Sequence, residues 1–198
     1  DVYKRQEYKN ASEEFAPQIT KLVQETIASV YPKYYPKEVV DFFAGLHCED
    51  AVRKDIRNGN IRMLLVEGCL AGTGSREGDH ITRVYVSPSF QGKGYGTYII
   101  KKLEEEIFSD YGRIYLDASL PACHLYETLG YKTSYHDKWE VENGVILVYE
   151  VMEKIRPEDI GQERPKKVLE EQSDSGKTEI FAADVRDEAL INRLTQVW

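Results

Sequence analysis

The residues with the clearest chemical use are three glycines in the segment Gln91-Gly92-Lys93-Gly94-Tyr95-Gly96. Apolar residues at helical spacing follow Thr97, so the segment opens a helix. Backbone N–H groups at a helix start are unpaired, and the helix dipole gives them partial positive charge. Glycines let a phosphate approach these groups closely, and Lys93 adds a flexible charge beside them. The segment therefore predicts a pyrophosphate site, with a plain turn as the structural alternative.

Two other phosphate-binding motifs are excluded by single residues. A dinucleotide-binding GxGxxG motif needs a third glycine where this chain has Thr97, and it follows a strand of a parallel βαβ unit instead of a meander. Near the C-terminus, Gly176-Lys177-Thr178 imitates the end of a P-loop, but the first glycine of that motif falls on Glu171. We therefore expect neither a dinucleotide-binding Rossmann fold nor a P-loop nucleotide-binding fold.

A second motif lies further along the chain, where Leu116-Asp117-Ala118-Ser119 is followed by Leu125-Tyr126-Glu127 and then by Leu129-Gly130-Tyr131. Together with Gln91, Gly94 and Gly96 after a strand that ends near Pro88, it resembles the paired motifs of the GNAT superfamily of N-acetyltransferases. The resemblance covers residues 7–154, which is the length of a whole domain.

The resemblance implies an α/β fold of the GNAT acyl-CoA N-acyltransferase type, with a mixed, mostly antiparallel, splayed sheet flanked by helices. The strand that ends at Val86 would part from the strand that ends near Ser119, and acetyl-CoA would bind in the gap. The pantetheine would pair with the backbone of Val84, Tyr85 and Val86. The pyrophosphate would rest on the amides of Gln91, Gly92, Lys93, Gly94, Tyr95, Gly96 and Thr97. Ser119 stands where the family often has Asn, and its hydroxyl could replace part of that contact with the pantetheine.

Tyr126 is the candidate general acid. It matches the position of a tyrosine that plays this role in many members of the family, and a phenol with a pKa near ~10 can protonate a thiolate leaving group. Its alternative role is packing beside the apolar Leu125 and Leu129.

His80 is the candidate general base, because it opens the strand that would bind the cofactor. Similar enzymes often place a glutamate at this position, and an imidazole can accept an amine proton near neutral pH. Glu67 and Asp79 are substitutes for this role, and a structural histidine at a strand end is the alternative. Asp117 could serve a strand-end turn or contact the acceptor.

The segment Tyr31-Pro32-Lys33-Tyr34-Tyr35-Pro36-Lys37 lies where the family shapes its acceptor pocket. Its aromatic rings could hold an amine by cation–π contact or could belong to the core. The implied function is transfer of an acetyl group from acetyl-CoA to a primary amine of a small molecule, peptide or protein, by direct attack in a ternary complex. The competing hypothesis is a non-catalytic acyl-CoA-binding sensor or interaction module.

The elements that must position these residues follow from the spacing of apolar side chains. Helical spacing predicts helices at 13–30, from Pro36 onward, at 49–57, after the glycine segment and at 121–129. Alternation between turn residues predicts strands at 61–66, 69–75, 80–86, 113–116 and 145–151, the first three as an antiparallel meander.

The composition is that of a globular protein, with 198 residues, 41% hydrophobic and 30% charged residues, and a net charge of −8. This acidic balance argues against a broad nucleic-acid-binding surface. Cys48, Cys69 and Cys123 form no CxxC pair and the histidines lack ligand spacing, so no disulfide framework or metal site is expected. With no signal peptide and no apolar run near the ~20 residues of a membrane span, we expect a cytoplasmic location away from membranes. The sequence does not decide the oligomeric state, and a homodimer is among the states that it allows.

The chain divides into four parts by composition. Residues 1–6 resemble the translation of an adapter used in sequencing libraries, and we expect them to be non-native. Residues 7–154 form the predicted acetyltransferase domain, and 155–178 form a charged linker. Residues 179–198 are either the start of a truncated second domain of the same superfamily or a segment that docks on the first.

Overall fold

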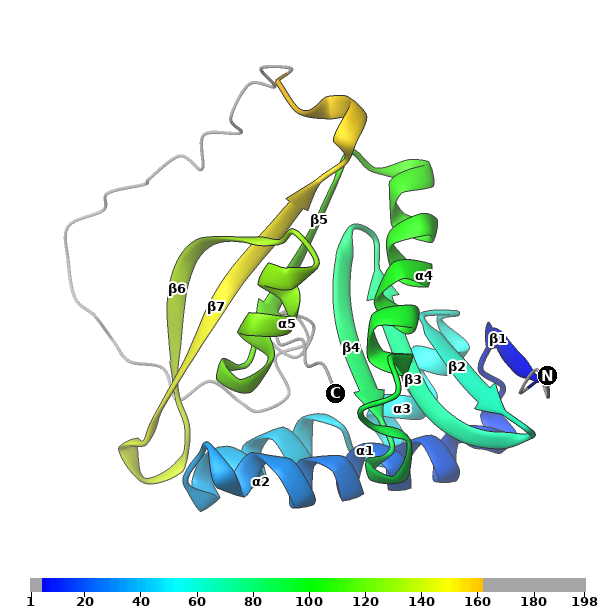
Figure 1. Cartoon of the computed structure of the whole chain (residues 1–198). Coiled ribbons are helices and arrows are strands. Elements are labelled where there is room, and N and C mark those ends of the chain that lie inside the picture. The colour runs from blue at the N-terminus through cyan, green and yellow to red at the C-terminus, as the bar shows by residue number, and fades with distance from the viewer. Residues whose placement is uncertain (1–4, 162–198) are drawn as a thin grey trace.

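One sheet dominates the computed structural model, which describes residues 5–161 (Figure 1). Within that range seven strands lie in the order β1-β2-β3-β4-β5-β7-β6. Their bounds are β1 Gln6–Asn10, β2 Ile61–Val66, β3 Cys69–Glu77, β4 His80–Val86, β5 Arg113–Ala118, β6 Lys132–Glu140 and β7 Ile146–Ile155. β4 and β5 run parallel, and every other neighbouring pair is antiparallel. The predicted mixed, mostly antiparallel sheet is therefore confirmed.

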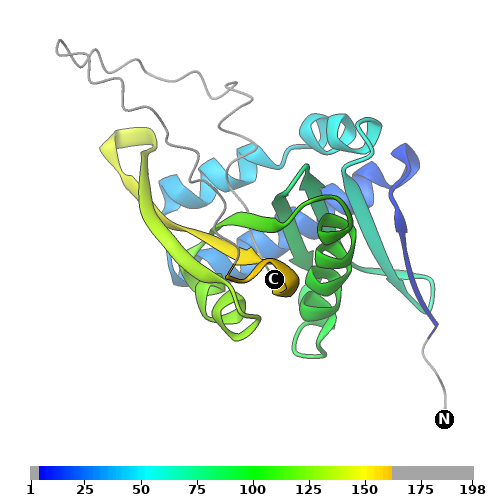
Figure 2. The ribbon, with the colours of Figure 1, turned by 90° about the horizontal axis from the view of Figure 1, so that it is seen from above.

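Helices cover both faces of the sheet, as the view from above shows (Figure 2). The helices are α1 Ala16–Val30, α2 Lys37–Leu46, α3 Glu49–Arg57, α4 Tyr95–Asp110 and α5 Cys123–Thr128. The first three share a buried apolar cluster with Tyr85 of β4 and Tyr149 of β7. The last two share another cluster with Val84 and Val86. Because side chains alternate along a strand, neighbouring residues of β4 enter opposite cores.

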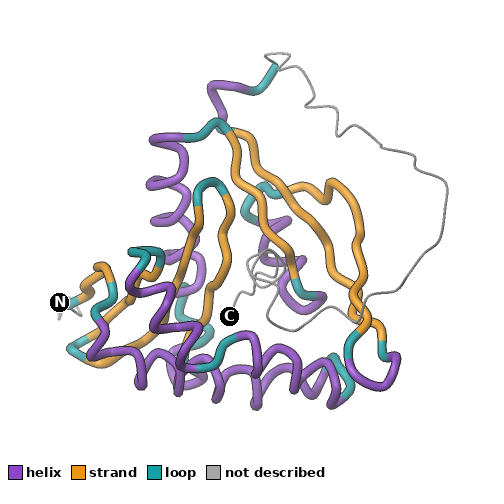
Figure 3. Tube along the Cα trace, turned by 180° about the vertical axis from the view of Figure 1, so that it is seen from behind, coloured by secondary structure: helices purple, strands orange, loops and turns teal. Residues whose placement is uncertain are grey.

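The sheet opens between its two parallel strands. β4 and β5 pair at a single position, His80 opposite Tyr115, where the Tyr115 N–H donates to the Asp79 carbonyl at 3.1 Å. Beyond this point the strands diverge, which is visible from the front and from behind (Figures 1 and 3). Each strand keeps a full antiparallel neighbour on its far side, β3 for β4 and β7 for β5. The gap is thus bounded by two supported strands.

Most predicted elements are confirmed, and the differences lie at their ends. The strands predicted at 61–66 and 80–86 and the helix at 49–57 match β2, β4 and α3. β3 and β5 each extend two residues further than predicted, and the late strand is Ile146–Ile155 instead of 145–151.

The predicted helices at 13–30 and 121–129 were wrong at their ends. Tight 3₁₀ turns at Glu13–Phe15 and Leu120–Ala122 precede α1 and α5. Pro17 lies in the first turn of α1 and Pro121 lies inside the second 3₁₀ turn, and proline lacks the N–H that an α-helix uses beyond its first turn. α5 stops at Thr128, and Gly130 then adopts φ +92°.

Two strands were not predicted, β1 and β6, and they are the two edges of the sheet. β6 is mostly exposed on both faces, so it lacks the apolar alternation of a half-buried strand. Gln6, in the segment expected to be non-native, begins β1 and pairs with Val66. Of the predicted linker, Ile155 ends β7 and Pro157–Asp159 forms a 3₁₀ turn. The predictions for 162–198 lie outside the described residues.

Two glycines of β3 let α4 pack closely against the sheet. A Cβ at Gly72 would lie 2.7 Å from Ile99 Cδ1 and 2.9 Å from the Tyr85 carbonyl oxygen. A Cβ at Gly74 would lie 2.5 Å from Ile99 Cγ2. These distances are far below van der Waals contact, so a side chain at either position would push α4 away from the sheet.

We expect Gly72→Ala to lower the free energy of unfolding by about 1–3 kcal/mol, because the backbone oxygen of Tyr85 cannot move aside. Urea denaturation followed by circular dichroism measures this. Gly45→Ala is the matched control, since Gly45 lies in α2 and a Cβ there would meet no atom within 4 Å. That variant should gain up to about 1 kcal/mol from helix propensity. Equal stability of the two variants would contradict the close packing of α4.

A buried polar cluster fixes the corner between α2 and α3 onto β4. Arg83 donates from Nε to His47 Nδ1 at 3.2 Å and from Nη2 to Asp55 Oδ2 at 3.0 Å. The Nε2 atom of His47 is buried without a hydrogen-bond partner among the described residues. Burial, and then the Arg83 charge, lower the pKa of His47 well below its usual 6.5. His47 is therefore neutral in the folded protein.

A histidine that is neutral when folded takes up a proton more readily when unfolded, so His47 makes the protein less stable as the pH falls below about 6.5. The slope for one group is about 1.4 kcal/mol per pH unit. His47→Asn keeps an acceptor for Arg83 without a titrating group, and we expect its free energy of unfolding to fall less steeply than that of the wild type. Urea denaturation at several pH values between about 7.5 and 5.5 compares the two slopes. If the free energy of unfolding fell with the same slope in both proteins, His47 would not be neutral in the folded state.

Candidate active site

A cleft of about 330 Å³ opens at the wide end of the gap between β4 and β5. It is lined by the end of β4, the glycine segment and the turn that leads into α5, that is, by Val86, Phe90, Gln91, Gly92, Gly94, Tyr95, Gly96, Thr97, Pro121, Ala122 and Leu125. The structure therefore brings most of the predicted cofactor residues to one concave surface. Ser119 and Tyr126 lie deeper, behind this surface, where both are buried.

The glycine segment forms the floor of the cleft. The first i→i−4 hydrogen bond of α4 runs from the Tyr98 N–H to the Gly94 carbonyl at 3.0 Å, so the N–H groups of Tyr95, Gly96 and Thr97 precede it. No acidic residue lies in this first turn. Gly94 has φ +82°, and a Cβ at this position would meet no atom within 4 Å. The segment thus presents helix-start amides to an anion without side chains in the way.

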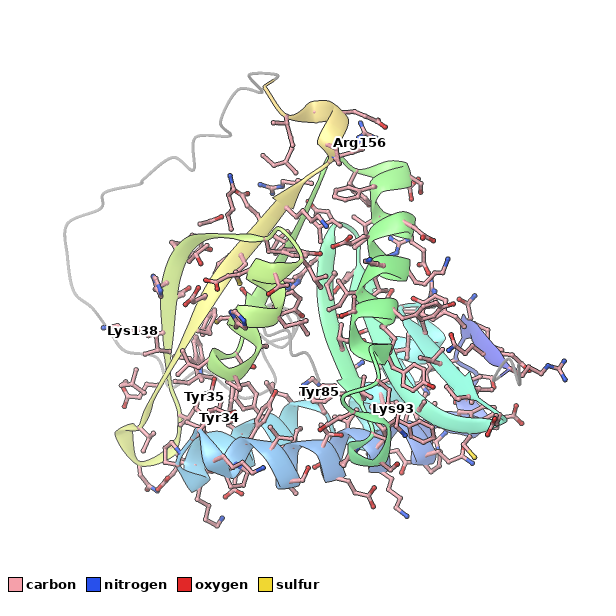
Figure 4. The ribbon with its side chains drawn as sticks, viewed as in Figure 1. Tyr34, Tyr35, Tyr85, Lys93, Lys138 and Arg156 are labelled. Atoms are coloured by element: carbon pink, nitrogen blue, oxygen red, sulfur yellow. The ribbon has the colours of Figure 1, made fainter. Side chains whose placement is uncertain are left out.

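Side chains hold this segment in place. Gln91 Nε2 donates to the Val86 carbonyl at 3.0 Å, which ties the segment to the end of β4. Lys93 Nζ donates to the Ser89 carbonyl at 3.2 Å and lies 5.3 Å from the centre of the Phe90 ring. Lys93 is placed in the loop that precedes α4 (Figure 4). The ammonium group of Lys93 is therefore held by its own loop, beside Phe90, which lines the cleft.

Tyr126 lies deep in the gap. Its side chain is fully buried, and its hydroxyl has no hydrogen-bond partner within residues 5–161. Burial raises the pKa of Tyr126 well above 10, and the nearby Tyr31, Cys123 and Asp117 raise it further. Its ring packs in the core of α4 and α5, whereas Tyr31 belongs to the core on the other face. The hydroxyl is therefore protonated and neutral.

Tyr35 closes the gap from the side of α2. Its hydroxyl accepts a hydrogen bond from the Leu120 N–H at 2.8 Å, and burial raises the pKa of Tyr35 to about 12. The Ser119 Oγ is buried close by, without a hydrogen bond of normal geometry. Tyr34 is 52% exposed, and Figure 4 places Tyr34 and Tyr35 beside α2, apart from Tyr85 on β4. Of the predicted aromatic segment, Tyr31 and Tyr35 are therefore core residues, and Tyr34 faces the surface.

His80 lies at the narrow end of the gap, next to a carboxylate. Its Nε2 is 3.4 Å from Asp117 Oδ2, and both side chains are almost completely buried. The imidazole also stacks on the ring of Tyr115, with centroids 4.4 Å apart and an angle of 5° between the planes. The sequence left two roles open for Asp117, and its place beside His80 and near Tyr126 puts it among the candidate reacting groups. Tyr115 was not predicted as a site residue.

The other two candidate bases differ in position. Glu67 has φ +54° in the turn between β2 and β3 and is exposed, away from the gap. Asp79 precedes β4 at the narrow end of the gap, where its carboxylate forms an ion pair with Arg113 of β5 at 3.3 Å.

Two other kinds of feature are missing from the described part of the chain. Residues 5–161 contain no group of three or more His, Cys, Asp or Glu side chains arranged to hold a metal ion. In the same range, no helix combines the length and the apolar character needed to cross a membrane.

Known structures share this arrangement. A GCN5-related N-acetyltransferase from Rhodopseudomonas palustris superposes with a TM-score of 0.69 at 22% identity, over 77% of this chain and 95% of that one. A PaiA N-acetyltransferase from Thermoplasma acidophilum, solved in complex with coenzyme A, gives 0.60 at 15% identity, over 76% and 99%. A ribosomal-protein-alanine N-acetyltransferase from Brucella melitensis gives 0.56 at 16% identity, over 75% and 99%. These likenesses confirm the predicted fold.

Sequence comparison gives the family. No curated protein sequence matches this chain. The family model described as the acetyltransferase (GNAT) domain matches residues 30–155, which span the gap, the glycine segment and α5. The chain therefore belongs to the GNAT acetyltransferase family.

Proposed function

We propose that the protein transfers an acetyl group from acetyl-CoA to a primary amine by direct attack in a ternary complex. The observation that carries the proposal is the cleft at the wide end of the gap between β4 and β5, which has Val86 and the helix-start residues of α4 on one side and Pro121, Ala122 and Leu125 on the other. The coenzyme A bound in the PaiA relative supports this choice of donor. When bound, acetyl-CoA supplies the thioester carbonyl that the amine attacks.

The residues of the cleft fit such a donor. The amides of residues 91–97 would hold the pyrophosphate, since helix-start N–H groups bind anions without a basic cluster. Val84, Tyr85 and Val86 lie beyond the single pairing of β4 with β5, so the backbone edge that they present to β5 is unpaired. An extended pantetheine could add to this edge as a strand. The buried hydroxyls of Ser119 and Tyr126 would gain the hydrogen-bond partners that they lack.

Two residues would move protons in this reaction. The Tyr126 hydroxyl, held neutral by burial, would donate its proton to the departing thiolate. His80 would accept a proton from the incoming ammonium group, from its position at the narrow end of the gap. The acceptor would enter from the face of α1 and α2, where Tyr34 is exposed.

Gly94→Glu should abolish binding of acetyl-CoA, because the carboxylate would project into the open space above the amides and repel the pyrophosphate. Isothermal titration calorimetry with acetyl-CoA measures this. Gly68→Glu is the matched control: Gly68 has φ +79° and equally open surroundings, but it lies in the turn between β2 and β3. The control introduces the same backbone strain and should bind normally. If the wild type does not bind acetyl-CoA, the proposed function fails.

Tyr126→Phe should lower kcat by about 100-fold or more, with little change in the dissociation constant of acetyl-CoA, because only the proton donor is lost. Release of free thiol with a panel of primary amines and peptides measures kcat. Tyr131→Phe is the control, since it removes another buried hydroxyl whose ring lies 5.3 Å from that of Tyr126. Equal activity in the two variants would remove the role assigned to Tyr126. Binding without thiol release across the whole panel would instead support the acyl-CoA-binding module.

A further inference from the structure

The narrow end of the gap holds a histidine and a carboxylate from two different strands. His80 begins β4 and Asp117 lies on β5, and their side chains are 4% and 5% exposed. The separation of 3.4 Å between Nε2 and Oδ2 is within ion-pair distance. The single backbone pairing between the strands, His80 opposite Tyr115, places Asp117 two residues further along β5 and on the same face as Tyr115.

Two contacts fix the imidazole ring. Stacking on Tyr115, with 5° between the planes, holds the plane of the ring, and the Arg113 guanidinium lies 5.7 Å from the centre of the Tyr115 ring. A stacked imidazole can still flip by 180° about its Cβ–Cγ bond, which exchanges Nε2 with Cε1 and Nδ1 with Cδ2. The Asp117 carboxylate selects the orientation in which Nε2 points toward β5.

We propose that Asp117 is a positioning residue for His80, which orients the imidazole and stabilises the imidazolium that forms when His80 accepts the proton of the acceptor amine. The inference rests on the proposed acetyl transfer and deepens it. A carboxylate beside an imidazole favours its protonated form, because it supplies the opposite charge in a site with little water.

The proton balance of the step is complete. One proton passes from the ammonium nitrogen to a ring nitrogen of His80. The lone pair of the amine then forms the C–N bond, the C–S bond breaks with its electrons on sulfur, and the thiolate takes the proton of Tyr126. The second proton of the nitrogen returns to the tyrosinate. The products are an amide, a free thiol and one proton on His80, which Asp117 stabilises.

Other charged groups lie around His80, and the one next to it in the chain, Asp79, forms an ion pair with Arg113 at 3.3 Å. On β3, Glu77 is the cross-strand neighbour of His80 and is exposed. On β4, Arg83 is bound to Asp55 of α3 and to His47. On β7, Glu153 lies opposite Tyr115. Asp117 is the buried carboxylate within 4 Å of the imidazole.

The first test measures the pKa of His80 directly in the whole protein, by NMR titration of its ring nitrogens, in the wild type and in Asp117→Asn. We expect the titration of the His80 ring to differ between the two proteins, since the carboxylate that contacts its Nε2 is removed. Glu77→Gln is the matched control, because it removes an exposed carboxylate on the neighbouring strand, and it should leave the His80 pKa unchanged.

The second test follows kcat/KM against pH with acetyl-CoA and a primary alkylamine. In Asp117→Asn, the rise of kcat/KM with pH should occur at lower pH, and the maximum value of kcat/KM should fall by about tenfold or more. Adding Asp117→Asn to His80→Gln should cost little further activity, because the carboxylate acts through the imidazole. A purely structural residue would move neither the His80 pKa nor the pH at which kcat/KM rises, and its loss would be additive with His80→Gln.

The possible failures are distinguishable. If the wild type binds acetyl-CoA and releases thiol, but Asp117→Asn leaves the His80 pKa and the pH at which kcat/KM rises unchanged, the positioning role is overturned and the proposed function stands. If the wild type releases no thiol with any amine, the proposed function and this role fall together, and a shifted His80 pKa would then report an ion pair only. Calorimetry with acetyl-CoA shows that each variant is folded.

Discussion

The site depends on one constraint, which is that β4 and β5 are joined at a single backbone position. Two parallel strands with matching edges would normally pair along their length, and full pairing would leave no room between them. Here β3 and β7 support the far edges of the two strands, so the unpaired edges stay apart without collapse of the sheet. The glycine segment lies at the wide end of the gap, and His80 lies at the narrow end. The divergence of β4 and β5 therefore sets the positions of the candidate reacting groups on these two strands.

The gap holds buried polar side chains. The hydroxyls of Tyr126 and Ser119 are buried without hydrogen-bond partners among the described residues. Each unsatisfied polar group of this kind costs about 1–3 kcal/mol of stability. A fold selected for stability alone would replace them with apolar side chains of similar size. Their position along the proposed path of the cofactor gives this cost a functional reason.

The parts of the site that were predictable from sequence are local. The glycine segment and the start of α4 could be predicted because a few neighbouring residues determine a helix start. The pairing of His80 with Asp117 could not be predicted, because it depends on where two strands far apart in sequence meet. The burial of Tyr31 and Tyr35 depends in the same way on how α2 packs against β7. The edge strand β6 escaped prediction because its polar, exposed residues carry no periodic signal.

The gap divides the sheet into two arms, one that ends with β4 and one that begins with β5. The helices α1 and α2 extend across both arms. α1 packs on the β4 arm, where the Thr26 hydroxyl oxygen lies 3.3 Å from the Val86 carbonyl oxygen. The turn before α2 is attached to the β5 arm, where the Tyr35 hydroxyl accepts from the Leu120 N–H at 2.8 Å. The two helices therefore connect the arms and fix the distance between them. Because the proposed acceptor side lies on the helical layer that also fixes this distance, we expect changes that adapt the protein to a different amine to alter the width of the proposed acyl-donor site as well.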